Sequence, residues 1–363
     1  MVVALFCLVC VSASMNETGQ RNEVVAVEIP RTNPTMADVA TAAGVSHQTV
    51  SRVLNNPASV PPRTRDRVQD AVARLGYHRN MTARALATGN THTIGVLITS
   101  ATFAGPSGTL MGIEKTARAA GYWVSMAGLD SDNPREAQDA FSHFINQGVT
   151  GIIAIIQTQS ALDATLDASL PMPVAFVTSG FVPDSQPCVD FDQADAVRQV
   201  MSILRGLGHT QVAHISGPLD DLHAAIRKTV WQESLVKGLD NQAMCQIGDW
   251  SAASGYRATL DLLAANQMLT AIFAGNDQMA LGALRALGDA GLDVPRDMSI
   301  VGFDDSVGSD NSIPPLTTIR QNRHALGQVA VELLLAAIEG QPAQHLRIPA
   351  ELVLRASTGA PNN

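Results

Sequence analysis

Residues 91–355 alternate between short apolar segments and longer amphipathic segments, and this alternation constrains the fold more than any other feature of the sequence. Apolar runs rich in Val and Ile are typical of strands buried in a parallel sheet, and apolar residues at helical spacing are typical of the helices that cover it. The strand-like runs are residues 93–98, 122–127, 151–156, 174–178, 212–216, 271–275 and 299–303. The helix-like segments include residues 108–120, 194–207 and 279–290. This order predicts an α/β body with doubly wound parallel sheets, and the number of strands favours two sheets.

Polar side chains follow several of these runs, where a ligand of a parallel sheet binds. Asp304, Asn276 and Thr99 each come directly after a predicted strand. A small molecule is held in such a position by planar polar groups that pair with its polar atoms and by aromatic faces that cover its C–H patches. Arg227 is a third candidate of the polar kind. At this point a helix cap or turn residue remains an alternative reading of Asp304.

Two aromatic residues, Trp250 and Phe103, are candidates for the apolar face of such a site. A half-buried core position is the alternative reading of Trp250. From these residues alone, a small-molecule site at the carboxyl ends of the strands and a purely structural role both stay open.

A different pattern precedes the body. Thr35 can cap a first helix, with Asp38 three residues later, and apolar residues follow at helical spacing. Gly44 ends this helix, and Ser46 can cap a second helix over residues 47–54. Two short helices joined by a turn with glycine are typical of a helix-turn-helix motif, so residues 34–79 are predicted to form a small all-α DNA-binding domain.

The start of the second helix carries residues that can read DNA. In a helix-turn-helix motif this end of the helix enters the major groove. Gln48 can bond adenine, Arg52 can bond guanine, and the Thr49 methyl can touch thymine. A third helix is expected from Pro62, and arginines 63, 65 and 67 at its start are candidate phosphate contacts.

Charge supports a polyanionic partner for the head. Residues 31–90 contain eight arginines against three aspartates, with no Lys or Glu, although the whole chain carries a net charge of -9. A basic segment on an acidic body fits a nucleic-acid-binding module, although charge alone does not exclude a chance excess of arginine.

Several segments together resemble the LacI/GalR family of regulators. In the head they are residues 35–40 (TMADVA), 43–55 (AGVSHQTVSRVLN) and 76–80 (GYHRN). In the body they are residues 217–219 (GPL), 248–252 (GDWSA), 276–283 (NDQMALGA) and 313–319 (IPPLTTI). The likeness runs from about residue 34 to the end of the chain. The head motif is highly specific, whereas the body motifs are specific only in combination.

The resemblance implies roles for residues of the head. His47, Gln48 and Arg52 are expected to read operator bases. A larger set is expected to hold phosphates, fix the register or contact DNA: Thr35, Met36, Ser46, Thr49, Ser51, Asn55, Thr64 and Asn80. A hinge helix over residues 80–90 is expected to insert Leu86, beside Ala83, into the minor groove. An ordinary interdomain helix is the alternative reading. Arg79 departs from the family pattern, which has proline there.

For the body, residues 91–357, the resemblance implies two subdomains joined by crossover strands, as in periplasmic sugar-binding proteins. The implied effector contacts are Thr99, Phe103, Thr178, Arg227, Trp250, Asn276, Asp304 and Gln321. Four positions depart from the resembled pattern, namely Ile155, Thr178, His223 and Arg323, and bear on which sugar is read. A galactoside is the leading candidate. The family dimerises, and because no apolar heptads follow residue 357 we expect a homodimer.

Other features set the remaining expectations. Residues 1–33 begin with an apolar stretch that lacks a basic start, and we expect a start site assigned too far upstream rather than a secretory signal. Four cysteines form no disulfide or metal framework, so no metal or cofactor is predicted. The motifs HExxH, GxSxG, GxGxxG and the Walker loop are absent from the sequence.

The sequence thus predicts a cytoplasmic, nucleoid-associated repressor without membrane partners and without enzymatic activity, released from operator DNA by a small sugar. An exported sugar-binding protein and a regulator with a purine effector are the alternatives. The predicted helix-turn-helix head argues against the first, because a transport receptor has no use for one.

Overall fold

The computed structural model describes residues 34–77, 91–99, 106–129, 134–235, 243–266 and 268–362. The chain divides into two compact units, residues 1–81 and 82–363. The predicted leader (residues 1–33), the predicted hinge helix with Asn80, Ala83 and Leu86, and the positions of Arg79 and Phe103 lie outside the described residues. Within the described ranges, no helix is both long enough and apolar enough to cross a membrane.

The first unit contains the predicted helices in the predicted order. They are α1 (Met36–Ala43), α2 (His47–Asn55), a short 3-10 helix η1 (Pro57–Ser59) and α3 (Pro62–Leu75). Apolar residues at helical spacing on all three α-helices close one small core around Val39, Val50, Val53 and Val68. The helix-turn-helix prediction for this segment is therefore confirmed.

Local interactions fix the ends of these helices. The Thr35 and Asp38 side chains form the reciprocal capping box at the start of α1, and Gly44 ends it in the left-handed conformation with φ of 62°. Ser46 caps α2 through its side chain, which accepts a hydrogen bond from the Thr49 N–H at 3.2 Å. Pro62 occupies the first turn of α3, where its missing N–H costs no helical hydrogen bond.

The second unit contains two parallel sheets. The first has the order β11-β5-β4-β3-β1-β2, and the second has the order β7-β6-β8-β9. The first sheet is formed by β1 (Thr93–Thr99), β2 (Trp123–Leu129), β3 (Gly151–Ile155), β4 (Val174–Val177), β5 (Cys188–Phe191) and β11 (His345–Ile348). The second is formed by β6 (Val212–Ser216), β7 (Cys245–Ile247), β8 (Ala271–Ala274) and β9 (Ser299–Val301).

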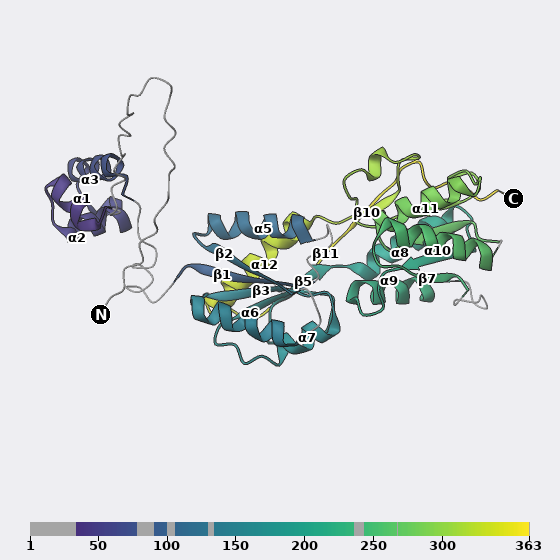
Figure 1. Ribbon diagram of the computed structural model, residues 1–363, viewed down its shortest axis with the longest axis horizontal. Helices are drawn as coiled ribbons and strands as arrows, with labels where there is room; N and C mark the ends of the chain where they lie inside the picture. Colours follow the sequence, from purple (N-terminus) through teal and green to yellow (C-terminus); the bar gives the residue numbers. More distant parts are fainter. Residues whose placement is uncertain are drawn as a thin grey trace, which may run out of the picture. The chain divides into compact units, whose positions relative to one another are not determined.

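Helices cover both faces of the first sheet, as alternating side chains of a buried strand require. They are α5 (Pro106–Ala119), α6 (Pro134–Gln147), α7 (Gln159–Leu166) and α12 (Arg323–Ile338). Val96 and Ile98 of β1 share one core with α5 and α12, whereas Leu97 shares another with α6 and α7. Figure 1 shows α5 and α12 on one side of this sheet and α6 and α7 on the other. The doubly wound prediction is confirmed.

The second sheet has four helices of its own. They are α8 (Gln193–Gly206), α9 (Leu222–Glu233), α10 (Ala252–Ala265) and α11 (Asp277–Asp289). Their buried residues and those of β6, β8 and β9 form a single core that contains Trp231 and Phe273. We call the part around the first sheet the N-subdomain and the part around the second sheet the C-subdomain.

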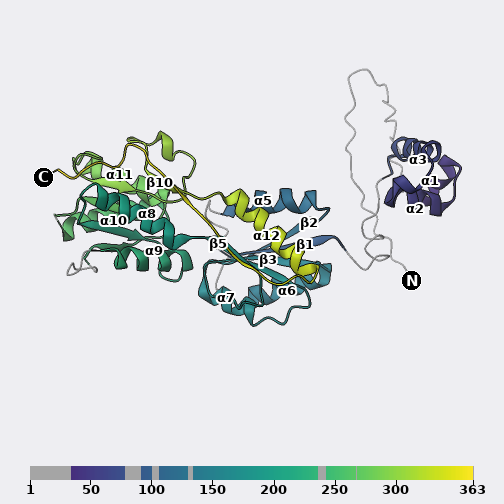
Figure 2. The same cartoon turned by 180° about the vertical axis from the view of Figure 1, so that it is seen from behind.

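The chain passes three times between the subdomains. It leaves the N-subdomain between β5 and α8, returns between β10 (Thr318–Arg320) and α12, and crosses again between β11 and β12 (Glu351–Val353). β10 and β12 pair antiparallel, so two of the crossings are joined side by side. Figure 2 shows these segments running between the two sheets. Residue 357 and its neighbours then pack on the C-subdomain, where the Ser357 hydroxyl donates to the Ile300 carbonyl at 2.6 Å.

Candidate functional site

The exposed start of α2 is the first candidate site. The side chains of His47, Gln48 and Arg52 are exposed and have no hydrogen-bond or ion-pair partner within the described part of the chain. The neighbouring hydroxyls are engaged locally, since Ser46 Oγ lies 2.9 Å from Thr49 Oγ1 and Asn55 donates to Ser51 Oγ at 3.2 Å. The first turns of α2 therefore expose three polar side chains without partners among the described residues, on a helix whose start is capped by Ser46.

The other predicted head residues lie around this surface in different settings. Thr35 is exposed and caps α1, Met36 is half-buried against the head core, and Thr64 is half-buried in the first turn of α3. Arg67, a candidate phosphate contact, donates to the carbonyls of Ala43 and Gly44. This position fits a guanidinium because the end of α1 leaves carbonyl groups without helical partners.

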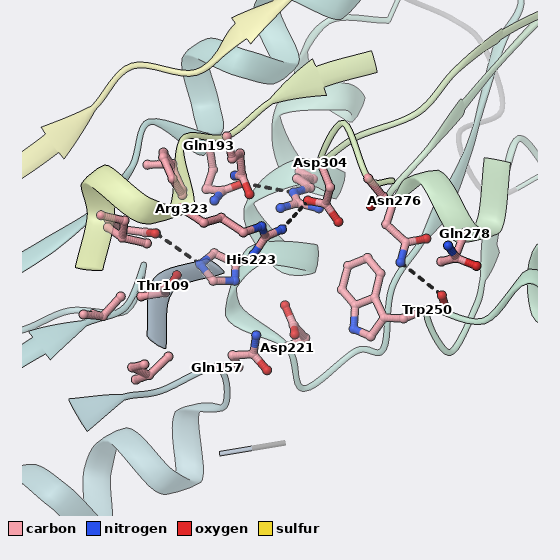
Figure 3. A pocket seen from close by; sticks show the side chains of 18 residues that line it. Thr109, Gln157, Gln193, Asp221, His223, Trp250, Asn276, Gln278, Asp304 and Arg323 are labelled. Carbon is pink, nitrogen blue, oxygen red and sulfur yellow. Dashed lines mark hydrogen bonds and ion pairs between the residues drawn. The ribbon is translucent and has the colours of Figure 1, made fainter. Parts of the chain in front are cut away.

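The second candidate site is a pocket of about 140 Å³ between the two subdomains of the body. It lies at the carboxyl ends of the strands, as expected for ligand sites of such sheets. Of the predicted effector contacts, the pocket brings together five, namely Arg227, Trp250, Asn276, Asp304 and Gln321. Figure 3 shows Trp250 and Asn276 on one side of the pocket and His223 and Arg323 on the other.

Arg227 is held rigidly in the pocket wall. It projects from α9 and is only 5% exposed. Its Nε donates to Gln193 at 3.0 Å and a terminal nitrogen donates to the Gly275 carbonyl at 2.5 Å. The guanidinium carbon lies 3.7 Å from the centroid of the Phe303 ring, a cation–π distance. These contacts fix the plane of the guanidinium before any ligand arrives.

Trp250 supplies the aromatic face. Its backbone has a positive φ of 69°. Its side chain packs partly against the core of the C-subdomain and also lines the pocket, so a half-buried position and a place in the pocket wall are compatible. A Cβ at Gly217 would lie 2.1 Å from the indole ring, so only glycine permits this ring position. The indole is therefore placed by the backbone of the β6–α9 loop.

Asp304 lies on a strained turn after β9. Its φ is 111° and that of Asp305 is 52°, both in the region that side chains rarely adopt. Several contacts hold the turn. They include the Asp304 N–H, which donates to the Ile319 carbonyl at 2.8 Å, and the Asp305 carboxylate, which accepts from Arg320 at 2.7 Å and from Arg355 at 2.6 Å. Burial raises the pKa of Asp305, but hydrogen bonds and charge from these two arginines outweigh it and keep the pKa below its ordinary value.

The side-chain amides of Asn276 and Gln321 differ in their hydrogen bonding. Asn276 caps α11 by accepting from Met279 N–H at 2.8 Å, and donates to the Trp250 carbonyl at 3.0 Å. Gln321 is 7% exposed, and its amide nitrogen has no hydrogen-bond partner within the described ranges. A buried donor without a partner is costly, so the Gln321 nitrogen is a natural contact for a ligand oxygen.

Two predicted contacts lie outside the pocket lining. Thr99 is buried, and its hydroxyl accepts from Gln157 N–H at 3.0 Å. Thr178 is also buried, and its hydroxyl accepts from Gly180 N–H at 3.2 Å. Both hydroxyls support the loops that follow their strands, so position after a strand did not distinguish lining from supporting residues.

The structure adds pocket residues that the sequence did not single out. They include Gln157, Asp190, Gln193, Asp221 and Gln278. Asp190 is the most notable, because this carboxylate is only 2% exposed and accepts from Ser179 and from His223, with His223 Nε2 at 3.1 Å. Its strand, β5, is four residues long and begins after a proline. The signal available was the apolar–polar alternation around it, which is too short to be diagnostic.

The Asp190–His223 pair perturbs both groups. Burial raises the pKa of Asp190, but the charge of His223 and the hydrogen bonds to the carboxylate have the larger, opposite effect. The pKa therefore lies below the ordinary value. Burial lowers the pKa of His223, but the charges of Asp190 and Asp221 and the hydrogen bond to Asp190 leave it above the ordinary value. The pair is therefore stabilised in its ionised form.

Comparisons with known proteins agree for both units. A family model of bacterial regulatory proteins, lacI family, matches residues 35–80, and a model of the periplasmic binding protein-like domain matches residues 202–358. The lactose operon repressor of Escherichia coli (strain K12) is 37% identical over 333 residues, which are 90% of this chain and 91% of that protein. The transcriptional repressor CytR of the same organism is 32% identical over 335 residues, with 91% and 97% covered.

Solved structures of transcriptional regulators also match this chain over most of its length. A crystal structure of the lac repressor dimer bound to operator and the anti-inducer ONPF matches with a TM-score of 0.80 and 35% identity, covering 91% of this chain and 100% of that one. A complex of the transcriptional regulator CelR with cellobiose matches with a TM-score of 0.67 and 29% identity, covering 89% and 99%. With its helix-turn-helix head and its two-subdomain body, the chain belongs to the lacI family of bacterial regulatory proteins.

Proposed function

We propose that this regulator represses transcription by binding operator DNA through its head, and that a small sugar bound in the pocket of its body releases it. The observation that carries this proposal is the occurrence in one chain of free polar groups on α2 and of a pocket in which Arg227, Trp250 and Asp304 converge. A repressor needs both sites, since the signal and the target are different molecules.

In the head, His47, Gln48 and Arg52 are the proposed base-reading residues, because their side chains have the donors and acceptors that base edges require. Ser46, Thr49, Ser51, Asn55 and Thr64 are the proposed phosphate contacts. The minor-groove role of Asn80, Ala83 and Leu86 stays a prediction from the sequence. A roughly palindromic operator follows if the protein is a homodimer, which the dimeric lac repressor complex supports.

In the body, the proposed ligand is a sugar whose hydroxyls bond to Asp304 and Gln321 and whose C–H face lies on Trp250. A galactoside is the first ligand to test, because the lactose operon repressor is among the relatives with highest identity. The CelR complex with cellobiose makes other sugars competing ligands. A purine effector is the alternative that the sequence leaves open, and purine nucleosides are its probes. Ligand that spans both subdomains shifts the body between two arrangements only to the extent that it binds them unequally.

The test is binding of the purified full chain to its own upstream DNA, followed by fluorescence anisotropy at several stated salt concentrations. Galactosides, cellobiose and nucleosides are then added one at a time. We expect one sugar to weaken specific binding by about 5- to 150-fold, the usual range of allosteric coupling. Specific binding that only a nucleoside alters would replace the sugar, and failure to bind specific DNA at any salt would overturn the repressor itself.

A further inference from the structure

Two ion pairs cross the pocket from one subdomain to the other. Arg323, the first residue of α12 in the N-subdomain, reaches Asp304 of the C-subdomain at 2.8 Å, and Figure 3 marks this contact. Asp190, on β5 of the N-subdomain, accepts from His223 in the first turn of α9 of the C-subdomain at 3.1 Å. In both pairs the partners are largely buried, with side-chain exposures of 24% and 17% in the first and 2% and 19% in the second.

These pairs balance the charge of the pocket. Its lining carries three carboxylates, Asp190, Asp221 and Asp304, and two guanidinium groups, Arg227 and Arg323. His223 is the remaining titratable group of the lining, and its pairing with Asp190 favours the protonated form. Positive and negative groups of the lining are then equal in number. Arg347, which is not part of the lining, lies 3.8 Å from the same oxygen of Asp190 that His223 contacts.

A balanced pocket treats charged and uncharged ligands differently. A neutral ligand can share the polar groups of each pair and leave the sum of charges at zero. A ligand with a carboxylate or an ammonium group leaves one charge uncompensated among largely buried side chains, which is unfavourable. The cation of each pair thus determines whether a charged or an uncharged ligand group is favoured beside the carboxylate.

We infer that Arg323 and His223 are specificity-determining residues: by pairing with Asp304 and Asp190 across the pocket, they restrict its ligands to uncharged, hydroxyl-rich molecules. This inference rests on the proposed sugar-binding function. Without Arg323, Asp304 loses the cation of its ion pair, and the pocket acquires an excess negative charge. The preference then moves toward ligands that bring a positive charge of their own.

The experiment compares three sugars that differ in one group: galactose, galactosamine and galacturonate, with glucose, glucosamine and glucuronate as a second set. Affinities of the full-length protein are measured by isothermal titration calorimetry. For the natural sequence we expect the neutral member of a set to bind at least about tenfold more tightly than its charged relatives, a difference of about 1.4 kcal/mol. For Arg323→Gln we expect the ratio of amino sugar to neutral sugar affinity to rise by about tenfold or more.

Arg323→Lys, which keeps the charge, is expected to retain the natural preference. Arg257→Gln is the matched control, since it removes an arginine from an exposed ion pair with Asp249 outside the pocket. Unchanged ratios in a folded Arg323→Gln protein, or a natural preference for a charged sugar, would overturn the inference and leave sugar binding intact. Lack of binding by every sugar of both sets, and by the galactosides and cellobiose as well, would instead overturn the proposed sugar effector, and the inference with it.

Discussion

Single residues decide the shape of the pocket, and Gly217 does so although it is not part of the pocket lining. A Cβ at this position would meet three atoms of the Trp250 indole at 2.1–2.5 Å. The indole lies close to the backbone of both Gly217 and Gly275, and a methyl group at Gly217 would force the ring to move out of the pocket wall. The sequence predicted Trp250 as a ligand contact, whereas the need for glycine beneath it follows only from the three-dimensional arrangement.

Gly217→Ala is therefore expected to displace Trp250 and to destabilise the body by about 1–3 kcal/mol, the usual effect of overpacking. Sugar affinity should fall, and tryptophan fluorescence should report a more exposed indole. Gly206→Ala, at the open end of α8 where nothing lies within 4 Å of the new methyl group, is the control. Full sugar affinity in Gly217→Ala would show that the indole position is unimportant for binding.

The Asp190–His223 pair makes a prediction about pH. The pKa of His223 is raised above 6.5 by its partners, so its stabilising effect is complete below that value and is lost as pH rises through the raised pKa. The pKa of Asp190 is lowered below 3.8, so its contribution is lost only as pH falls through that lowered value. His223→Gln should therefore lower the free energy of unfolding by about 1–3 kcal/mol near pH 6, and less near pH 9.

Only the difference between the two proteins isolates this pair. Burial lowers the pKa of His214 to about 3, and burial together with the Asp304 charge raises the pKa of Asp277 to about 7, so both groups also change stability with pH. They are present in both proteins and cancel in the comparison by urea unfolding. His143→Gln, an exposed change on α6, is the control. A His223→Gln effect that is constant across this pH range would contradict the ionised pair.

At the scale of elements, the strongly apolar strands were predictable and the crossovers were not. β3, β4, β6 and β8 are buried throughout and β1 is buried from Ile94 onward, which gives the continuous apolar runs of a parallel sheet. β10, β11 and β12 are short and partly exposed, and carry Arg320, His345, Arg347 and Glu351. These strands show no apolar periodicity in the sequence. They are held in place by pairing with distant segments rather than by burial of their side chains.

The turn after β9 links the pocket to these crossovers. The Asp305 carboxylate bonds to Arg320 of β10 and to Arg355 just beyond β12, while Asp304 next to it faces the pocket. Asp305→Asn is expected to cost about 1–3 kcal/mol of stability, because the half-buried Arg355 is left with a weaker partner. It should also weaken sugar binding, since the strained turn presents Asp304.

Chemical denaturation and calorimetry of the same protein check both effects. Asp297→Asn, in a more exposed pair with Arg296, is the comparison and should leave sugar affinity unchanged. If Asp305→Asn lowers stability but binds sugar normally, the turn is held by its backbone hydrogen bonds alone, and the link between the pocket and the crossovers does not exist.

At the scale of the whole molecule, the charge pattern and the two kinds of periodicity in the sequence predicted a basic helical head and an α/β body, and the structure has both units. What the sequence could not supply was the set of pairs formed across the pocket. Asp190 and His223 lie 33 positions apart in the chain, and no local pattern relates them. Such pairs depend on how two separately folded subdomains meet.

The central claim is that one molecule couples operator binding to sugar binding. The most direct measurement is the affinity for the inducing sugar, taken by calorimetry with the full-length protein alone and then saturated with its operator. Thermodynamic linkage requires that operator weaken sugar binding by the same factor by which sugar weakens operator binding, about 5- to 150-fold. Equal sugar affinity with and without operator would show two independent sites on one chain and would contradict the account.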